Sequence, residues 1–195
     1  MPKPRPRALL IGPLLALLGL WGCASAEPRR TRADLTHPFL GPDYSAWLVG
    51  PIAAMATPQE IDAYLALSGD AEARAFIDGF WRKRQQPNSS TNDALETYRR
   101  RCAVADQKFS EGGLLGQRTD RGTVFVLHGP PATTQFQISP APQDPPIELW
   151  VYGADAPAGL DGKRPAKFYR FIKRGDVTVT YTPTTPRNRP RPFSG

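Results

Sequence analysis

The chain is poor in the residues and motifs on which common enzyme chemistries depend. Its 195 residues include two cysteines and two histidines. It contains no CxxC pair, no GxSxG or HExxH motif and no phosphate-binding glycine loop, so serine hydrolase, metalloprotease and nucleotide-dependent chemistry have no support. A single histidine without a second ligand or a positioned nucleophile makes neither a metal site nor a catalytic triad. We therefore expect no metal and no small-molecule cofactor.

The chain also lacks an apolar run long enough to span a bilayer as a helix. The longest run, Ala8 to Trp21, is interrupted by Gly12-Pro13 and falls short of the ~20 residues that a membrane-spanning helix needs. Cations without an acid precede this run, and small residues follow it. That order is typical of a secretory signal peptide, which we expect to cover residues 1–22.

Two cleavage sites compete after the apolar run. Leu20-Trp21-Gly22-Cys23 resembles the bacterial lipobox, which is cut in front of a cysteine that carries a lipid, with palmitate among its acyl chains. Ala24-Ser25-Ala26 is instead an A-x-A site for an ordinary signal peptidase. We favour the lipobox, and with it a membrane anchor on Cys23 in the bacterial cell envelope. Because no aspartate follows Cys23, we expect the outer membrane, facing the periplasm.

The two cysteines fit this interpretation. A lipid on Cys23 leaves Cys102 unpaired, which an oxidising compartment tolerates only if the thiol is shielded. A disulfide between Cys23 and Cys102 is the alternative outcome.

The net charge of +7 does not indicate a nucleic-acid partner once its position along the chain is considered. Residues 33–182 carry 16 basic and 17 acidic side chains, a net charge of −1. The excess cations lie at the ends, where residues 23–32 and 183–195 together hold six arginines against Glu27. The Pro- and Arg-rich tail 183–195 is expected to be disordered. Such ends either attract anionic lipid headgroups or act as solvated, solubilising segments.

Helix signals follow a Pro- and Gly-rich segment, residues 23–56, that we expect to form a linker and an irregular arm. Thr57-Pro58-Gln59-Glu60 has the residues of a capping box, with proline at the first helical position. A second helix is predicted over Asp70–Arg84, closed by cations that suit a last turn. A third begins at Asp93, and its apolar stripe includes Cys102. We interpret this thiol as a core residue and not as a nucleophile.

The pattern changes from helical to extended after Gly122. The strands that it predicts are Thr123–His128, Ile147–Tyr152, Phe168–Lys173 and Val177–Tyr181. The last two are joined by a hairpin turn at Arg174-Gly175-Asp176. The predicted fold class is therefore α+β, with N-terminal helices packed on a small, mostly antiparallel sheet. This domain would cover residues 57–182 and form one core with Trp81 near its centre.

Several short matches, in order along residues 75–182, resemble the GWxTD domain. They are Phe80-Trp81-Arg82, Asn92, Tyr98-Arg99, Ala105-Asp106, Phe109, Gly116 to Gly122, Val124 to Leu127, Gly129-Pro130-Pro131 and Glu148 to Tyr152. The resemblance implies a bacterial family of exported proteins, often lipoproteins, with no established activity. This chain has Gln117 in place of the signature tryptophan, and His128 and Ala132 in place of the usual tyrosine and aspartate around Gly-Pro-Pro. A binding function of the tryptophan would be lost or changed here.

The candidate binding residues lie in and after this motif. They are Arg118, Thr119, Asp120, Arg121, His128 and Trp150. On the structural interpretation, Asp120 forms the turn before a strand and its carboxylate accepts backbone N–H bonds. On the functional one, Asp120 and His128 form a polar pair, although an intervening strand would hold them ~20 Å apart.

Two hypotheses of function follow. The first is a noncatalytic protein-interaction or assembly module at a membrane, whose partner is another envelope protein. Its groove would lie between the helices and the sheet and would use exposed aromatic residues such as Trp150 or Tyr152. The second is an envelope enzyme of unfamiliar type that uses Asp120, Arg121 and His128. We favour the module because these polar residues lack catalytic geometry.

Overall fold

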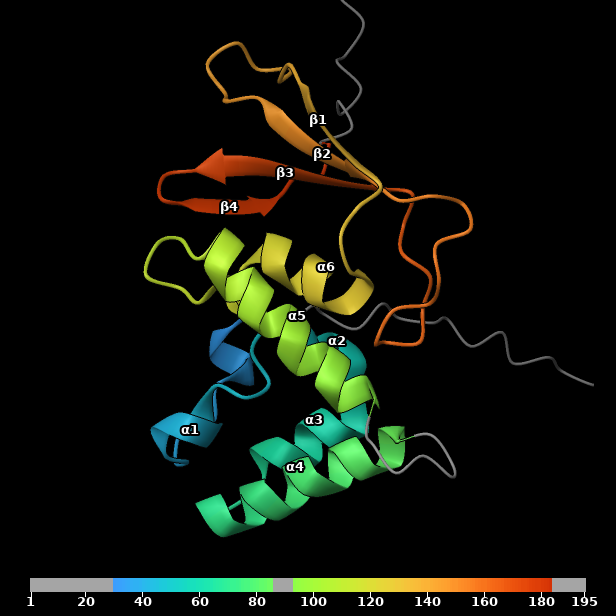
Figure 1. The fold of residues 1–195 in the computed structure, drawn as a ribbon. Helices are drawn as coiled ribbons and strands as arrows, with labels where there is room; N and C mark the ends of the chain where they lie inside the picture. The colour runs from blue at the N-terminus through green and yellow to red at the C-terminus, as the bar shows by residue number, and fades with distance from the viewer. Residues whose placement is uncertain (1–29, 86–92, 184–195) are drawn as a thin grey trace, which may run out of the picture.

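The computed structural model describes residues 30–85 and 93–183, so the predicted signal peptide, the lipid site Cys23 and all but the first residue of the predicted tail lie outside the described residues. A layer of helices covers one face of a four-stranded antiparallel sheet, which confirms the α+β class (Figure 1). The helical elements are η1 (Ala33–Leu35), α1 (Pro42–Ser45), α2 (Pro51–Met55), α3 (Pro58–Leu65), α4 (Asp70–Arg84), α5 (Asp93–Phe109), η2 (Gly116–Arg118) and α6 (Asp120–His128). The strands are β1 (Thr133–Gln137), β2 (Ile147–Val151), β3 (Phe168–Arg174) and β4 (Val177–Thr180). None of the described helices is both long and apolar enough to cross a membrane.

The three predicted N-terminal helices are confirmed. At the start of α3, the Thr57 hydroxyl accepts from the Glu60 N–H, and the Glu60 carboxylate accepts from the Thr57 N–H, each at 3.1 Å. This is the reciprocal capping box that the sequence predicts. In α5, Cys102 is buried at 6% exposure, and burial raises the pKa of its thiol to about 11. The thiol is therefore protonated at neutral pH, as expected of a core residue.

The predicted strand over Thr123–His128 is wrong, because these residues belong to helix α6. The Thr119 hydroxyl caps this helix by accepting from the Gly122 N–H at 3.1 Å. The helix ends at Gly129, whose φ of 80° suits glycine. A short apolar run is compatible with either a buried strand or a buried helix, so periodicity alone could not separate them. In the sequence, Thr119 in front of this run is the signal that favours a helix, because threonine is a preferred N-cap residue.

The sheet has the order β1-β2-β3-β4, with every pair antiparallel. Three of its strands confirm predictions, and the β3–β4 turn places Gly175 at a φ of 58°, as a tight hairpin requires. Strand β1 was not predicted. Its sequence, Thr-Thr-Gln-Phe-Gln, lacks alternating apolar residues, and all five of its residues are exposed.

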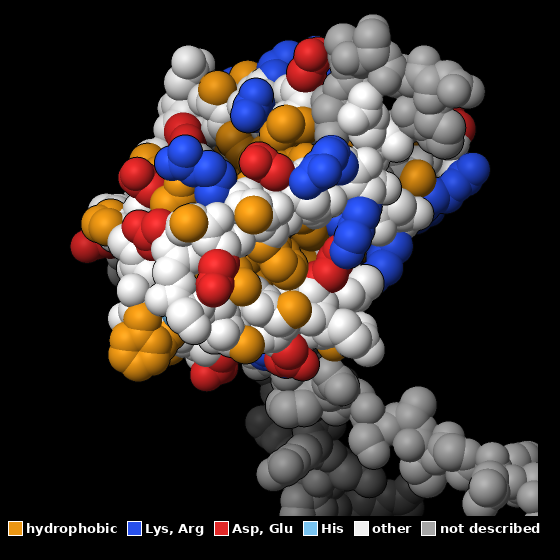
Figure 2. All heavy atoms as spheres, turned by 90° about the horizontal axis from the view of Figure 1, so that it is seen from below, with side chains coloured by type: hydrophobic (Ala, Val, Ile, Leu, Met, Phe, Trp, Pro, Cys, Tyr) orange, Lys and Arg blue, Asp and Glu red, His pale blue; other side chains and the backbone are white. Residues whose placement is uncertain are grey.

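The core consists of two adjoining apolar clusters, where a single one was predicted. The first packs the arm, including α2, against α3 and α4 around Ile52, Tyr64 and Trp81. The second joins α5 and α6 to the sheet, and Tyr98 packs against both clusters. The arm is more regular than expected, since η1, α1 and α2 lie within it. At the end of the molecule opposite the sheet, acidic and basic side chains are interspersed among apolar ones (Figure 2).

Candidate functional site

The signature segment Gly116–Asp120 forms the tight connection between α5 and α6. A Cβ at Gly116 would overlap the Ala105 carbonyl oxygen of α5, and one at Gly122 would overlap the Gly116 carbonyl. The Thr119 hydroxyl donates to the Gly116 carbonyl at 2.8 Å and accepts from the Gly122 N–H. With Thr119 3% exposed, the glycines and the threonine of this segment serve close packing and helix capping.

Gln117, in the position of the signature tryptophan, binds one carboxylate of α5. Its backbone N–H donates to Asp106 Oδ1 at 2.8 Å, and its side-chain Nε2 donates to Asp106 Oδ2 at 2.9 Å. Both oxygens of Asp106 therefore accept from one residue. The glutamine fixes the segment against α5 through polar contacts.

Asp120 is the first residue of α6, and its carboxylate reaches the sheet. Oδ2 accepts from the backbone N–H of Thr180, in β4, at 2.6 Å. The structural interpretation foresaw a backbone N–H as donor but placed it in the turn of Asp120 itself. The actual donor lies 60 residues further along the chain, in a strand that the sequence pattern could not pair with this residue.

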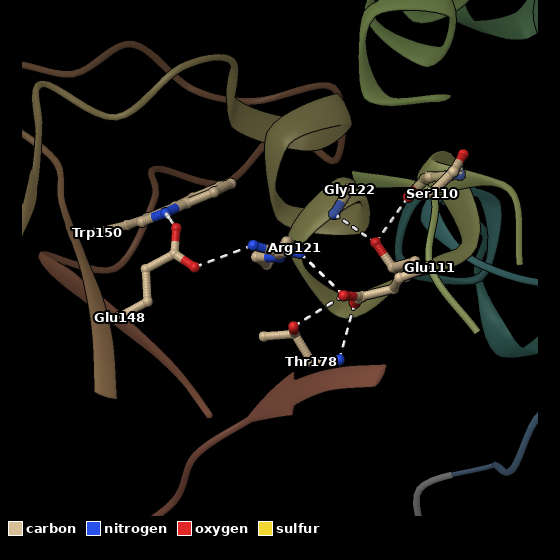
Figure 3. A network of polar contacts seen from close by, with 9 residues as sticks. Ser110, Glu111, Arg121, Gly122, Glu148, Trp150 and Thr178 are labelled. Atoms are coloured by element: carbon tan, nitrogen blue, oxygen red, sulfur yellow. Dashed lines mark hydrogen bonds and ion pairs between the residues drawn. The ribbon is translucent and has the colours of Figure 1, made fainter. Parts of the chain in front are cut away.

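Arg121 is held between two carboxylates in a network that joins both layers (Figure 3). Its guanidinium binds Glu111 at 2.9 Å and Glu148 at 3.1 Å. Glu148 also accepts from Trp150 Nε1 at 2.7 Å, and Glu111 accepts from the N–H and the hydroxyl of Thr178, both at 2.8 Å. The charged side chains are 13–20% exposed. The network therefore ties the loop after α5, α6, β2 and β4 to one another.

The expectation that Trp150 and Tyr152 are exposed is wrong. Trp150 is 2% exposed and packs against Phe109 and Phe171. Tyr152 is 4% exposed, and its hydroxyl donates to the Gly129 carbonyl at 2.8 Å. Trp150 and Tyr152 pack in the cluster that joins the sheet to α5 and α6, so they belong to the core and offer no groove surface.

His128 lies at the far end of α6 from Asp120. Eight residues of helix separate the two by ~12 Å along the axis, so the structure does not bring them together. The imidazole contacts the rings of Tyr152 and Tyr169, with centroids 6.1 and 5.8 Å away. Burial lowers its pKa below the usual value; Asp161 opposes this effect and Arg101 adds to it. His128 is therefore neutral at pH 7, and its Nδ1 has no hydrogen-bond partner among the described residues.

Arg118 and Asp120 lie on a cleft of about 440 Å³, which we call the basic cleft. The segments that form it are the start of the arm, α2, the beginning of α3, the η2–α6 connection and the end of β4. Its lining residues are Arg30, Arg32, Leu35, Val49, Gly50, Ala53, Ala54, Pro58, Ile61, Arg118, Asp120, Thr123, Val124 and Thr180. The lining thus combines three arginines and one acid with a largely apolar wall.

Two polar contacts and one glycine set the walls of the basic cleft. Arg32 donates to the Arg118 carbonyl at 3.0 Å, and Arg30 pairs with Asp62 at 2.7 Å. Gly50 has a φ of 98°, and a Cβ there would lie 2.9 Å from the Gln117 carbonyl oxygen. The wall can come this close only with glycine at this position. Because its residues come from distant segments, sequence reasoning found Arg118 and Asp120 but missed the cleft itself.

The comparisons with known proteins agree with the short matches along the chain. The model of the GWxTD domain matches residues 36–159. The chain belongs to the GWxTD domain family. Its match begins inside the arm, ahead of the expected boundary at residue 57, in keeping with the packing of η1, α1 and α2 in the core. Neither the curated proteins nor the solved structures include a match.

In the described part of this GWxTD protein, no group of three or more His, Cys, Asp or Glu side chains is arranged to hold a metal ion. Within its signature, Thr119 and Asp120 bind backbone groups, and Gln117 binds the Asp106 carboxylate of α5. The basic cleft presents arginines beside apolar side chains and includes the signature residues Arg118 and Asp120, so we take it as the candidate recognition site.

Proposed function

We propose that this GWxTD protein is a noncatalytic interaction module, held at a membrane of the bacterial cell envelope by a lipid on Cys23, and that its partner is another envelope protein. The observation that carries the proposal is the use of the signature's polar groups within the fold. Thr119 caps α6, Asp120 binds the backbone of β4, and Arg121 is paired with two carboxylates. Groups committed in this way are poorly placed to act on a substrate.

The enzyme alternative requires Asp120, Arg121 and His128 to act on one substrate. Asp120 and His128 are ~12 Å apart along α6, and the guanidinium of Arg121 is occupied by Glu111 and Glu148. The imidazole of His128 contacts the rings of Tyr152 and Tyr169 and lies away from both Asp120 and the guanidinium network. This arrangement favours binding over catalysis.

The basic cleft supports a specific kind of partner. Its volume of about 440 Å³ lies in the range of small binding sites. Of its arginines, Arg30 is already paired with Asp62, whereas Arg32 contacts a neutral carbonyl. A carboxylate next to an apolar side chain would complement both the cations and the apolar wall. We therefore infer that the partner presents an acidic residue beside an apolar one in a short segment.

The proposed anchor lies close to the basic cleft along the chain. Cys23 precedes Arg30 by seven residues, and an extended chain of that length spans ~25 Å. A lipid on Cys23 would therefore keep the cleft near the membrane surface. Proteins anchored in the same membrane could then reach it at a high effective concentration.

Site-specific photocrosslinking in living cells tests this function. A photoreactive residue in place of Ala54, which lines the cleft, should form an adduct with a defined envelope protein. The matched control is Ala63, an exposed alanine of α3 outside the cleft lining, which should not form that adduct. Arg32→Glu should abolish the Ala54 adduct, because a carboxylate would then face the acidic residue of the partner. The same adducts from both positions, or an adduct unaffected by Arg32→Glu, would contradict the proposal.

A further inference from the structure

The two edges of the sheet differ in how their backbone groups are satisfied. On β4, the N–H of Thr178 donates to Glu111 at 2.8 Å, and the N–H of Thr180 donates to Asp120 at 2.6 Å. These alternate N–H groups therefore point away from β3 and are capped by carboxylates from the helical layer. An edge capped in this way cannot accept a further strand without losing these bonds.

The opposite edge, β1, has no such protection among the described residues. All five of its residues are exposed, and within the described chain it pairs only with β2. Every residue from Gly129 to Gln143 is uncharged, and residues 133–137 contain no proline. Proteins usually block an open edge with lysine, proline or a covering segment. The described part of this chain uses carboxylate caps at one edge only.

Two large apolar side chains are exposed at the β1 edge. Phe136 is 72% exposed and Ile138 is 95% exposed. In the register of β1 and β2, Phe136 stands opposite Glu148 and Thr134 stands opposite Trp150. Paired residues, and residues two apart in a strand, point to the same face of the sheet. The ring of Trp150 packs against Phe109 of α5, so this is the face toward the helices. Phe136 therefore projects on the side of the sheet that the helices cover. The helical layer shields β2, β3 and β4 on this side but leaves β1 open (Figure 1).

We propose that β1 is the surface through which two copies of this chain associate, pairing their β1 strands antiparallel so that the two sheets become one. A twofold axis through β1 places the same residues on both sides of the contact. Because the strand carries no charge, this pairing sets no like charges against each other. It also brings Phe136 of each copy to the same face, where both rings lose exposed area.

The occupant that fits this edge best is a second copy. The residues of the chain after Pro183 include Pro186, Pro190 and Pro192, which lack the N–H groups that a regular strand must contribute. The uncharged strand also offers no charge pattern by which it would select a differently charged partner. The proposal uses neither the basic cleft nor its ligand, so the two can fail independently.

The test is sedimentation of the full mature protein in mild detergent over a wide range of concentrations. We expect a monomer–dimer equilibrium that Phe136→Lys weakens by ~10-fold or more, since the substitution places two like charges across the strand pair. The matched control is Phe39→Lys, at an 84% exposed position outside the sheet, which should leave the equilibrium unchanged. A monomer at every concentration, or equal effects of the two substitutions, would overturn the proposal.

A second measurement on the unaltered chain needs no variant. Amide hydrogen exchange of residues 133–137 should slow as the protein concentration rises, because pairing protects the outward N–H groups of β1. Exchange at Thr178 and Thr180 should not depend on concentration, since these groups are bonded within one copy. Exchange in β1 that is fast and independent of concentration would show that copies do not pair there, and would leave an extended segment of another protein as the occupant.

Discussion

The Asp120 carboxylate accepts a hydrogen bond from the backbone N–H of Thr180 at 2.6 Å and so joins the first turn of α6 to the edge strand β4. Together with the bonds from Thr178 to Glu111, this contact fixes the sheet edge against the helical layer. The aspartate of the GWxTD signature thereby acquires a structural role in this chain.

That role predicts different outcomes for two substitutions of Asp120. Asp120→Asn should largely preserve stability, because the amide oxygen can accept the same bond from Thr180. Asp120→Ala should lower the free energy of unfolding by ~1 kcal/mol, since the contact is partly solvated. Chemical denaturation of both variants measures the difference. Equal losses for Asn and Ala would indicate that the charge, and not the hydrogen bond, stabilises the fold.

Arg121 should be far less tolerant of substitution. Arg121→Met shortens the side chain and leaves the partly buried Glu111 and Glu148 without their cation, which should cost ~2–3 kcal/mol, below the ~3–5 kcal/mol of a fully buried pair. The double variant Arg121→Met/Glu148→Gln should recover part of this loss, because it removes one of the unpaired charges. Thermal unfolding of both variants tests the prediction. A single variant as stable as the unaltered protein would mean that the network is not a stabilising one.

Trp81 should be among the most costly core residues to truncate. It is 5% exposed, and its ring lies 5.3 Å from Phe80 and 4.9 Å from Tyr98, centroid to centroid. Trp81→Ala should therefore cost ~3–5 kcal/mol. Phe39→Ala, at an 84% exposed aromatic, is the control and should change stability little. Similar melting temperatures for the two variants would place Trp81 outside the core.

His128 predicts a pH dependence of stability. Burial lowers its folded-state pKa below the usual value of 6.5, so the unfolded chain binds the proton more readily. Its contribution to stability is thus complete above pH 6.5 and is lost as the pH falls from there toward the lowered pKa. His128→Gln should flatten the decrease in melting temperature between about pH 7 and pH 5. Identical pH profiles for variant and parent would show that the pKa of His128 is unshifted by folding.

The anchor prediction rests on residues outside the described structure. Cys23→Ser should leave a folded domain that is released from the membrane fraction. Acyl chains contribute ~0.8 kcal/mol per buried methylene, which basic segments alone do not match. Fractionation after a salt wash measures the effect. Retention of the serine variant in the washed membranes would exclude lipidation as the anchor.

The sequence predicted those elements whose signals are local. Thr57 and Glu60 cap α3 as expected, and Gly175 forms the β3–β4 turn. The strand β1 could not be predicted, because its sequence has no alternating apolar pattern. Its residues are held in a strand by their pairing with β2. The run from Val124 to Leu127 was assigned to a strand because such a short apolar segment fits either structure.

The candidate site depended on contacts that no local pattern encodes. The partner of Asp120 is 60 residues away in the chain, and Arg32 meets the carbonyl of Arg118 across 86 residues. Trp150 was assigned to the surface, yet its ring packs against Phe109 of α5. Motif reasoning identified residues near the basic cleft, whereas the cleft itself required the fold.

The measurement that tests the central claim most directly is complementation of a deletion strain by Asp120→Asn and by Arg32→Glu. The first variant removes the carboxylate that the enzyme alternative needs, and the second reverses a charge that lines the basic cleft. Neither side chain is buried in the core, so we expect both variants to fold, and thermal unfolding of each variant checks this. The account predicts that Asp120→Asn restores function and that Arg32→Glu, folded and membrane-bound, does not. Loss of function in a stable Asp120→Asn protein, together with full function of Arg32→Glu, would contradict it.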